Sequence, residues 1–206
     1  MALRRFFNLF VALILFGCSF EQDEKINYEA EFYSIVSEFE KSSILNFDRK
    51  DIDKEIFIEQ FILKLDKQKN TFLQEDFNTF RETANNQTKS NYQQLKDVVD
   101  LYYLRYEEAL KTRRQYLNNF DFNYNKIEKI NLKPRDSFFQ NKEEKQDYQR
   151  RIVKNELINL LLEDKNNFEA KSELKKTYTN RLSSISKIRE SDRFGILANN
   201  FLSMLD

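Results

Sequence analysis

Glycine and proline are almost absent from this chain, and their scarcity limits its fold more than any other feature. The 206 residues include 2 Gly and 1 Pro, at Gly17, Gly195 and Pro134. A sandwich, a barrel or a doubly wound sheet needs many tight turns, and glycine supplies the positive φ angles of such turns at the lowest cost. Helices joined by polar loops have no such need. The sequence therefore predicts an all-α fold.

Apolar side chains recur every three or four residues over most of the chain, which is the period of an amphipathic helix. Phe120, Phe122 and Tyr124 instead alternate, as in an extended segment. We expect a single orthogonal domain of about six or seven helices with one extended connector. The expected helices cover 28–39, Asp53–Leu65, Glu75–Arg81, Asn91–Asn119, Lys142–Glu163, Glu169–Ile188 and Ser191–Asp206, and the connector covers Phe120–Pro134.

The same periods predict which side chains face the core. We expect inward-facing residues in two of the helices at Ile56, Phe57, Phe61 and Leu65, and at Tyr148, Ile152, Ile158, Leu161 and Leu162. An N-cap is expected between Asp48 and Asp53 for one helix and at Ser191 for the last helix, because short polar side chains accept hydrogen bonds from free N–H groups there.

The first 18 residues have the layout of a secretory signal peptide. Arg4 and Arg5 precede an apolar run from Phe6 to Gly17 that is broken only by Asn8. As a helix this run would reach roughly 18 Å, against about 30 Å for the hydrocarbon core of a bilayer. The sequence therefore predicts a cleaved leader at 1–17.

Leu15, Phe16, Gly17 and Cys18 resemble a bacterial lipobox, in which cleavage falls between the last two residues. We expect Cys18 to carry the lipid anchor, 18–25 to form a short tether, and 26–206 to form the helical domain. Several acyl chains anchor firmly, since each buried CH₂ contributes about 0.8 kcal/mol. The alternative is an ordinary signal peptide with an incidental cysteine.

Missing residue types exclude several kinds of site. The chain has no His and a single Cys, so a zinc site built on those ligands, a Ser-His-Asp triad and a Cys-His dyad are excluded. A Gly-rich phosphate loop is excluded as well. Carboxylate, Lys or Tyr chemistry remains open, as does no chemistry at all. We expect no metal and no cofactor.

The charges of the chain balance, with 34 basic and 34 acidic side chains. Without Arg4 and Arg5 the acids outnumber the bases by two. Such a balance argues against binding nucleic acid and against electrostatic docking on a membrane.

Two basic clusters with neighbouring aromatic residues could bind nucleic acid, and two pairs of acids could act as general acid and base. Ordinary helix surfaces explain both patterns better. We expect the basic clusters to be solvated helix faces with i,i+4 ion pairs, and the acids to favour helix dipoles. The clusters are Lys111, Arg113 and Arg114 near Tyr116, and Arg150, Arg151 and Lys154 near Tyr148; the acid pairs are Asp51 with Asp53 and Glu75 with Asp76.

From about Leu45 to Asp206 a series of short motifs resembles the N-terminal helical domain of the tail-specific, or carboxy-terminal processing, serine protease family. The motifs follow the order of that family. They are Phe57, Phe61 and Leu65-Asp66; Thr71-Phe72-Leu73 with Asp76 and Phe80; Arg150-Arg151-Ile152-Val153-Lys154-Asn155; Tyr178-Thr179-Asn180-Arg181-Leu182; and Phe194 to Asp206.

The resemblance implies a periplasmic enzyme that trims or degrades proteins from their C-termini. A PDZ domain engages the substrate tail, a Ser/Lys dyad hydrolyses it, and the helical domain frames these parts and contacts substrates or a lipoprotein adaptor. We expect the PDZ and catalytic domains to lie beyond Asp206, so that this chain carries no catalytic residue. The alternative is a complete, non-catalytic helical lipoprotein that acts as an interaction module or protease regulator.

Overall fold

The computed structural model describes residues 26–42, 53–85, 88–130 and 133–204. Within them the chain forms seven helices, and the isolated pairing of Leu73 with Phe139 belongs to no strand. The predicted all-α fold is confirmed. The helices are α2 (Tyr28–Ser42), α3 (Lys54–Leu65), α4 (Gln74–Thr83), α5 (Asn91–Asn119), α6 (Lys142–Leu162), α7 (Asn167–Ser186) and α8 (Glu190–Leu202).

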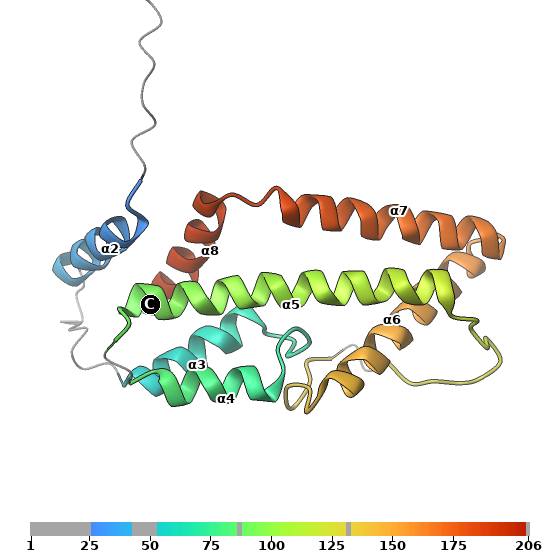
Figure 1. Ribbon diagram of the computed structural model, residues 1–206, viewed down its shortest axis with the longest axis horizontal. Helices are drawn as coiled ribbons and strands as arrows, with labels where there is room; N and C mark the ends of the chain where they lie inside the picture. Colours follow the sequence, from blue (N-terminus) through green and yellow to red (C-terminus); the bar gives the residue numbers. More distant parts are fainter. Residues whose placement is uncertain (1–25, 43–52, 86–87, 131–132, 205–206) are drawn as a thin grey trace, which may run out of the picture.

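Helix α5 is the axis of the molecule (Figure 1). It has 29 residues, so it is about 43 Å long. Ser90 caps it, because its hydroxyl accepts the Gln93 N–H at 3.2 Å. Helices α2, α3 and α8 pack against its first half, whereas α6 and α7 pack against its second half. The two halves therefore have separate surroundings.

The first core surrounds the N-terminal half of α5. Its members are mostly aromatic and aliphatic side chains, and their rings meet at short range: Phe32 lies 4.9 Å and Phe57 5.3 Å from Phe201, between ring centroids. The buried hydrophobic members of this core are Phe32, Val36, Ile58, Phe61, Ile62, Phe72, Phe77, Ala84, Tyr92, Leu95, Val98, Val99, Phe138, Leu197 and Phe201.

The second core lies between α5, α6, α7 and the connector. Tyr178 is its largest fully buried side chain. A small cluster of Leu73, Phe139 and Tyr148 forms a further apolar group. The buried members of the second core are Leu110, Leu117, Phe122, Val153, Leu157, Ala170, Leu174, Tyr178 and Ile185.

Two turns use residues other than glycine at positive φ. Lys69 has a φ of 52° and Asp164 a φ of 64°. Such a conformation costs roughly 1–2 kcal/mol for an L-residue. The scarcity of glycine is therefore met partly by accepting this strain at the α3–α4 and α6–α7 turns.

The predicted inward faces of α3 and α6 are partly wrong. Ile58 and Ile62 are buried in α3, whereas Ile56 is 55% exposed. In α6 Tyr148 is buried as predicted, but the other buried apolar residues are Val153 and Leu157, and Leu162 is 78% exposed. The reason in α6 is that Lys145, Gln149 and Lys154 occupy buried positions on the helix, which displaces the apolar pattern.

The predicted N-caps have different outcomes. Asp53 caps α3 as expected, and its carboxylate accepts the N–H groups of Glu55 and Ile56 at 2.9 and 3.2 Å. Ser191 is wrong as a cap, because α8 begins one residue earlier. The Asp192 carboxylate accepts the Arg189 N–H at 3.0 Å and so satisfies the free donor at that end.

Candidate interaction site

Gly17 and Cys18, the predicted cleavage and lipidation residues, lie outside the described residues. The described chain begins at Ile26, two residues before α2. None of the helices in 26–204 that the structure describes combines the length and apolar content that a bilayer crossing requires.

The turn after α3 is closed by a buried carboxylate. Asp66 is 3% exposed and accepts the N–H groups of Asn70, Thr71 and Phe72 at 3.1, 2.9 and 3.0 Å. These three bonds provide partners for backbone donors of the turn. The Leu-Asp motif identified in the sequence therefore shapes the path from α3 to α4.

Asp76 joins α4 to α5. Its carboxylate accepts the Leu73 N–H at 2.9 Å and two hydrogen bonds from the Arg105 guanidinium, at 3.0 and 2.8 Å. These bonds with Asp76 raise the pKa of Arg105 above its ordinary value. The predicted dipole role of Asp76 was incomplete, because the side chain also forms an ion pair that is largely shielded from water.

Lys145 on α6 reaches into the same region. Its ammonium donates to the Thr71 carbonyl and, at 3.4 Å, to the Arg105 carbonyl. Burial lowers the pKa of Lys145 to about 8, and the positive charge of Arg105 acts in the same direction, whereas Glu108, Asp76 and Asp66 oppose it. Lys145 thus connects α6 to both α5 and the α3–α4 turn.

A groove of about 290 Å³ opens beside Lys145, between α5 and α6. Its α6 wall consists of Lys142, Lys145, Gln146 and Gln149, which follow the helical period. Arg105 and Glu108 of the α5 wall form an ion pair at 3.0 Å. The groove has polar and apolar walls, and its Arg105 and Lys145 are engaged by Asp76, Glu108 and backbone carbonyls.

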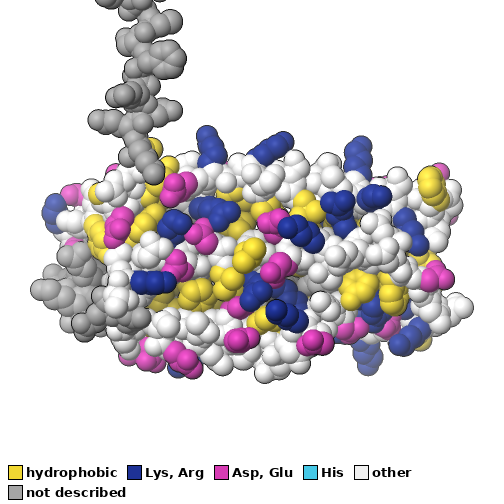
Figure 2. Space-filling view, in the orientation of Figure 1, with side chains coloured by type: hydrophobic (Ala, Val, Ile, Leu, Met, Phe, Trp, Pro, Cys, Tyr) yellow, Lys and Arg dark blue, Asp and Glu magenta, His cyan; other side chains and the backbone are white. Residues whose placement is uncertain are grey.

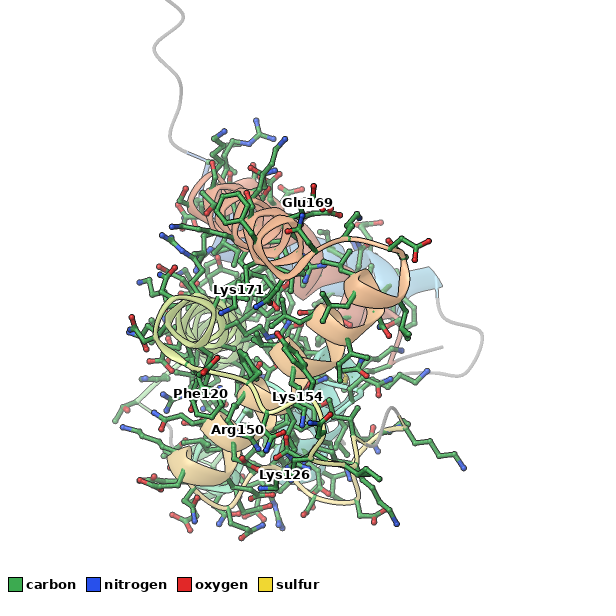
Figure 3. The ribbon with its side chains drawn as sticks, turned by 90° about the vertical axis from the view of Figure 1, so that its right-hand side faces the viewer. Phe120, Lys126, Arg150, Lys154, Glu169 and Lys171 are labelled. Carbon is green, nitrogen blue, oxygen red and sulfur yellow. The ribbon has the colours of Figure 1, made fainter. Side chains whose placement is uncertain are left out.

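The connector is fixed to α6 by the Glu128 cluster, which comprises Glu128, Arg150 and Lys154. Glu128 accepts hydrogen bonds from Arg150 and, at 2.9 Å, from Lys154. These bonds, that of Arg150 first, lower the pKa of Glu128 to about 2. Lys154 also donates to the Lys126 carbonyl, and Figure 3 shows Lys126, Arg150 and Lys154 close together there.

The prediction that Arg150, Arg151 and Lys154 form a solvated face is wrong for two of the three. The side chains of Lys154 and Arg150 are 5% and 16% exposed. The local i,i+3 and i,i+4 pairs with Asp147 do exist, at 2.9 and 3.0 Å. However, the stronger partner is Glu128, which the helical spacing alone could not reveal.

The other basic cluster is also divided. Lys111 forms the expected i,i+4 pair with Glu107 at 2.6 Å. Arg113 turns inward, donating to Gln149 Oε1 at 2.7 Å and stacking over the Tyr178 ring with 5.9 Å to its centroid. The Tyr178 hydroxyl donates to Glu156, and burial raises the pKa of Tyr178.

Three aromatic rings cover the end of α5. Phe120 lies 4.9 Å from Phe122, and Phe122 6.5 Å from Tyr124, between centroids. Arg150 stacks over Phe120 with 5.7 Å to its centroid, and the Tyr124 hydroxyl donates to Asn167 at 3.0 Å. The start of the predicted connector is confirmed as non-helical and packed on the helices, whereas 124–126 form a turn and 131–132 lie outside the described residues.

Several large apolar side chains nevertheless face solvent near the connector and the α6–α7 turn. Ile127 is 92%, Leu162 78% and Phe168 83% exposed. Within the described part of the chain, no group of three or more His, Cys, Asp or Glu side chains is placed to hold a metal ion.

Comparison with known families identifies this arrangement of helices. The family described as "Tail specific protease N-terminal domain" matches residues 35–206. The chain belongs to this family. A search of curated proteins returned no match.

The motifs that carried the sequence resemblance hold the fold together at separate points. Asp66 and Asp76 organise the α3–α4 turn, Arg150 and Lys154 hold the connector, and Tyr178 fills the second core. Sequence reasoning did not single out Glu128, Lys145 or Gln149. The sequence does contain a signal for the last two, because Lys145 and Gln149 are four residues apart and therefore share one side of the helix, next to Tyr148.

Proposed function

We propose that this chain is the N-terminal scaffolding and contact domain of a periplasmic, lipid-anchored, C-terminal-processing serine endopeptidase. The observation that carries the proposal is the family match over residues 35–206. We assign binding of the substrate tail to a PDZ domain and hydrolysis to a Ser/Lys catalytic domain of the same protease.

The contacts of the ionisable groups support a framing role. The pKa values of Lys145 and Glu128 are both lowered, to about 8 and about 2. Both groups are nevertheless held in structural contacts: Lys145 donates to the Thr71 carbonyl, and Glu128 accepts from Lys154. Such contacts fix the α5–α6 geometry and the connector. A rigid frame of this kind suits a domain that positions other domains.

Exposed apolar side chains support the contact role. Ile127, Leu162 and Phe168 are the kind of residue that protein partners cover. We assign them to contact with the remainder of the protease, with protein substrates or with a lipoprotein adaptor. The balanced total charge gives no reason to add nucleic acid to these partners.

The domain assignment predicts a difference in activity between two polypeptides. The native polypeptide, isolated with antibody raised against residues 19–206, should shorten an unfolded test protein from its C-terminus. The 206-residue chain alone should leave the same protein intact. Hydrolysis by the chain alone would contradict the assignment.

The anchor assignment predicts that Cys18→Ala moves the protein from the membrane fraction to the soluble periplasmic fraction. The acyl chains would be lost, while the helical domain would remain. Fractionation followed by immunoblotting measures this change. Retention of the variant in a salt-washed membrane fraction would count against lipidation at Cys18.

A further inference from the structure

The positive charges of α7 are segregated from its negative charges. Residues 174–189 contain five Lys or Arg and no Asp or Glu. The two acids of α7 lie in its first two turns and are engaged there: Glu169 accepts the Asn166 N–H at 3.0 Å, and Glu173 pairs with Lys165 at 2.8 Å. The remaining two thirds of the helix are therefore cationic.

Four cations of this stretch are exposed and form no ion pair with any residue that the structure describes. We call them the cationic strip; they are Lys175, Lys176, Arg181 and Lys187. Arg189, the fifth cation, pairs with Asp192 at 3.2 Å. On the helical period Lys176 and Lys187 lie opposite the buried face of α7, and exposed Thr179 and Ser183 share their side of the helix. Lys175 and Arg181 lie on the two flanks of the helix, from which long side chains can reach outward.

The strip lies on one long edge of the molecule. Figure 2 shows Lys and Arg side chains projecting along the edge formed by α7, whereas Asp and Glu side chains gather along the opposite edge, over α4. The net charge of zero therefore hides a separation of charge between two edges. A balanced total charge therefore does not prevent this local surface from docking on a membrane.

The strip also lies on the side of the molecule where the chain enters the described domain. Tyr28, at the start of α2, packs against Phe194 of α8 with ring centroids 5.0 Å apart, and α8 follows directly after α7. The eight residue steps from Cys18 to Ile26 span at most about 28 Å when fully extended. A lipid anchor at Cys18 would thus hold this side near the bilayer, within reach of a helix that is itself about 30 Å long.

We propose that the cationic strip of α7 lies against an anionic lipid surface, so that the long axis of the domain runs along the membrane. The inference rests on the proposed anchoring at Cys18, which brings the strip close enough to act. Lys and Arg side chains are attracted to anionic headgroups within a Debye length, about 8 Å at physiological ionic strength. The opposite edge, with α4, then faces away from the membrane.

The test places a fluorophore on each edge of the full, lipidated chain. Ser183→Cys puts a unique free thiol on α7, and Asn78→Cys puts one on α4, because the sulfur of a lipidated Cys18 does not react. The labelled proteins are reconstituted into vesicles of phosphatidylcholine, with or without phosphatidylglycerol, that contain lipids with a nitroxide quencher in the headgroup. Two fluorophores on one chain would show that Cys18 has a free thiol and carries no lipid. That result, or failure of the protein to remain in the vesicles, would contradict the lipid anchor rather than the cationic strip.

In the anionic vesicles the α7 fluorophore should be quenched, and the α4 fluorophore should not. High salt, or neutral vesicles, should reduce quenching at α7 to the level at α4. Equal quenching at both positions, or quenching that ignores lipid charge, would overturn the proposal. The proposal would also be overturned if the cationic strip bound a single-stranded RNA while quenching at α7 did not respond to lipid charge.

Charge removal supplies the matched comparison. The strip variant carries Lys175→Gln, Lys176→Gln, Arg181→Gln and Lys187→Gln, and it should lose quenching at α7 while remaining anchored. The control variant removes the same charge elsewhere, by Lys41→Gln, Lys67→Gln, Lys129→Gln and Lys142→Gln, and it should keep quenching. Circular dichroism establishes that both variants are folded; equal loss in both would contradict the strip.

Discussion

The first and second cores share α5 but are stabilised differently. Around Phe32, Phe61 and Phe201 the contacts are between apolar rings and aliphatic chains. Around Val153 and Leu157 the apolar contacts are accompanied by the Glu128 cluster and by Arg113, Gln149 and Tyr178. The difference teaches that one helix can carry a core held mainly by apolar packing and a second core that is joined to a cluster of largely buried charges.

The largest expected effect comes from the first core. Phe61 is fully buried, so Phe61→Ala should lower the free energy of unfolding by about 4 kcal/mol through lost burial and a cavity. Urea denaturation measures this loss. The matched control is Phe168→Ala, at a side chain that is 83% exposed, and it should change stability by less than about 0.5 kcal/mol. Similar losses in both variants would refute the assignment of the core.

A smaller effect is expected in the second core. Glu128→Gln leaves Lys154 and Arg150 without their shared carboxylate in a largely buried position, and it should cost about 2 kcal/mol. Adding Lys154→Met should recover part of the loss, since an unpaired cation is then removed. The control is Glu163→Gln, whose partner Lys165 is reached at the surface, with an expected change below about 0.5 kcal/mol. No recovery in the double variant would contradict the pairing.

Lowering the pH should affect the stability contributed by the two cores differently. The pKa of Glu128 is lowered to about 2, against about 4.3 for an unfolded glutamate. The unfolded chain therefore binds a proton that the folded chain does not, and the contribution of Glu128 is lost as pH falls from about 4.3 toward 2. The gap in unfolding free energy between the parent chain and Glu128→Gln should shrink over this range, whereas the Phe61→Ala gap should not. A constant Glu128→Gln gap would exclude the proposed ion pair.

The smallest effect concerns Lys145. Its pKa is lowered to about 8, whereas an unfolded lysine titrates near 10.4. Between these values the unfolded state binds more protons, so this group should make stability rise with pH from about 8 until the tyrosines begin to ionise near 10. Unfolding curves of the parent chain and Lys145→Met at several pH values should differ in slope over this window. Parallel slopes would show that Lys145 is not buried as described.

The helices were predictable where the apolar period is long and undisturbed. The range Asn91–Asn119 was predicted and is observed for α5, because its apolar residues recur over many turns. Helix α6 was predicted in extent but not in orientation. Its buried Lys145, Gln149 and Lys154 look solvated in the sequence, and only the folded chain brings the charge of Glu128 to Lys154.

The contacts between distant segments and the exposed side chains of the candidate site were less predictable from the sequence than the fold. Glu128 and Lys154 are 26 residues apart, and no spacing rule connects a connector residue to a helix residue over that distance. The exposure of Leu162 and Phe168 depends on where the α6–α7 turn ends the bundle, which is a tertiary feature. The segregation of charge along α7 was visible in the sequence, but its significance required knowing which edge α7 occupies.

The central claim is that this helical domain is the front part of an anchored protease. The measurement that tests it most directly is the apparent mass of the native polypeptide, by immunoblot of source cells with antibody against residues 19–206. The account predicts a band roughly two to three times heavier than the 25.0 kDa of this chain, since further domains should follow it. A single band near 25 kDa would contradict the account and would favour a free-standing lipoprotein module.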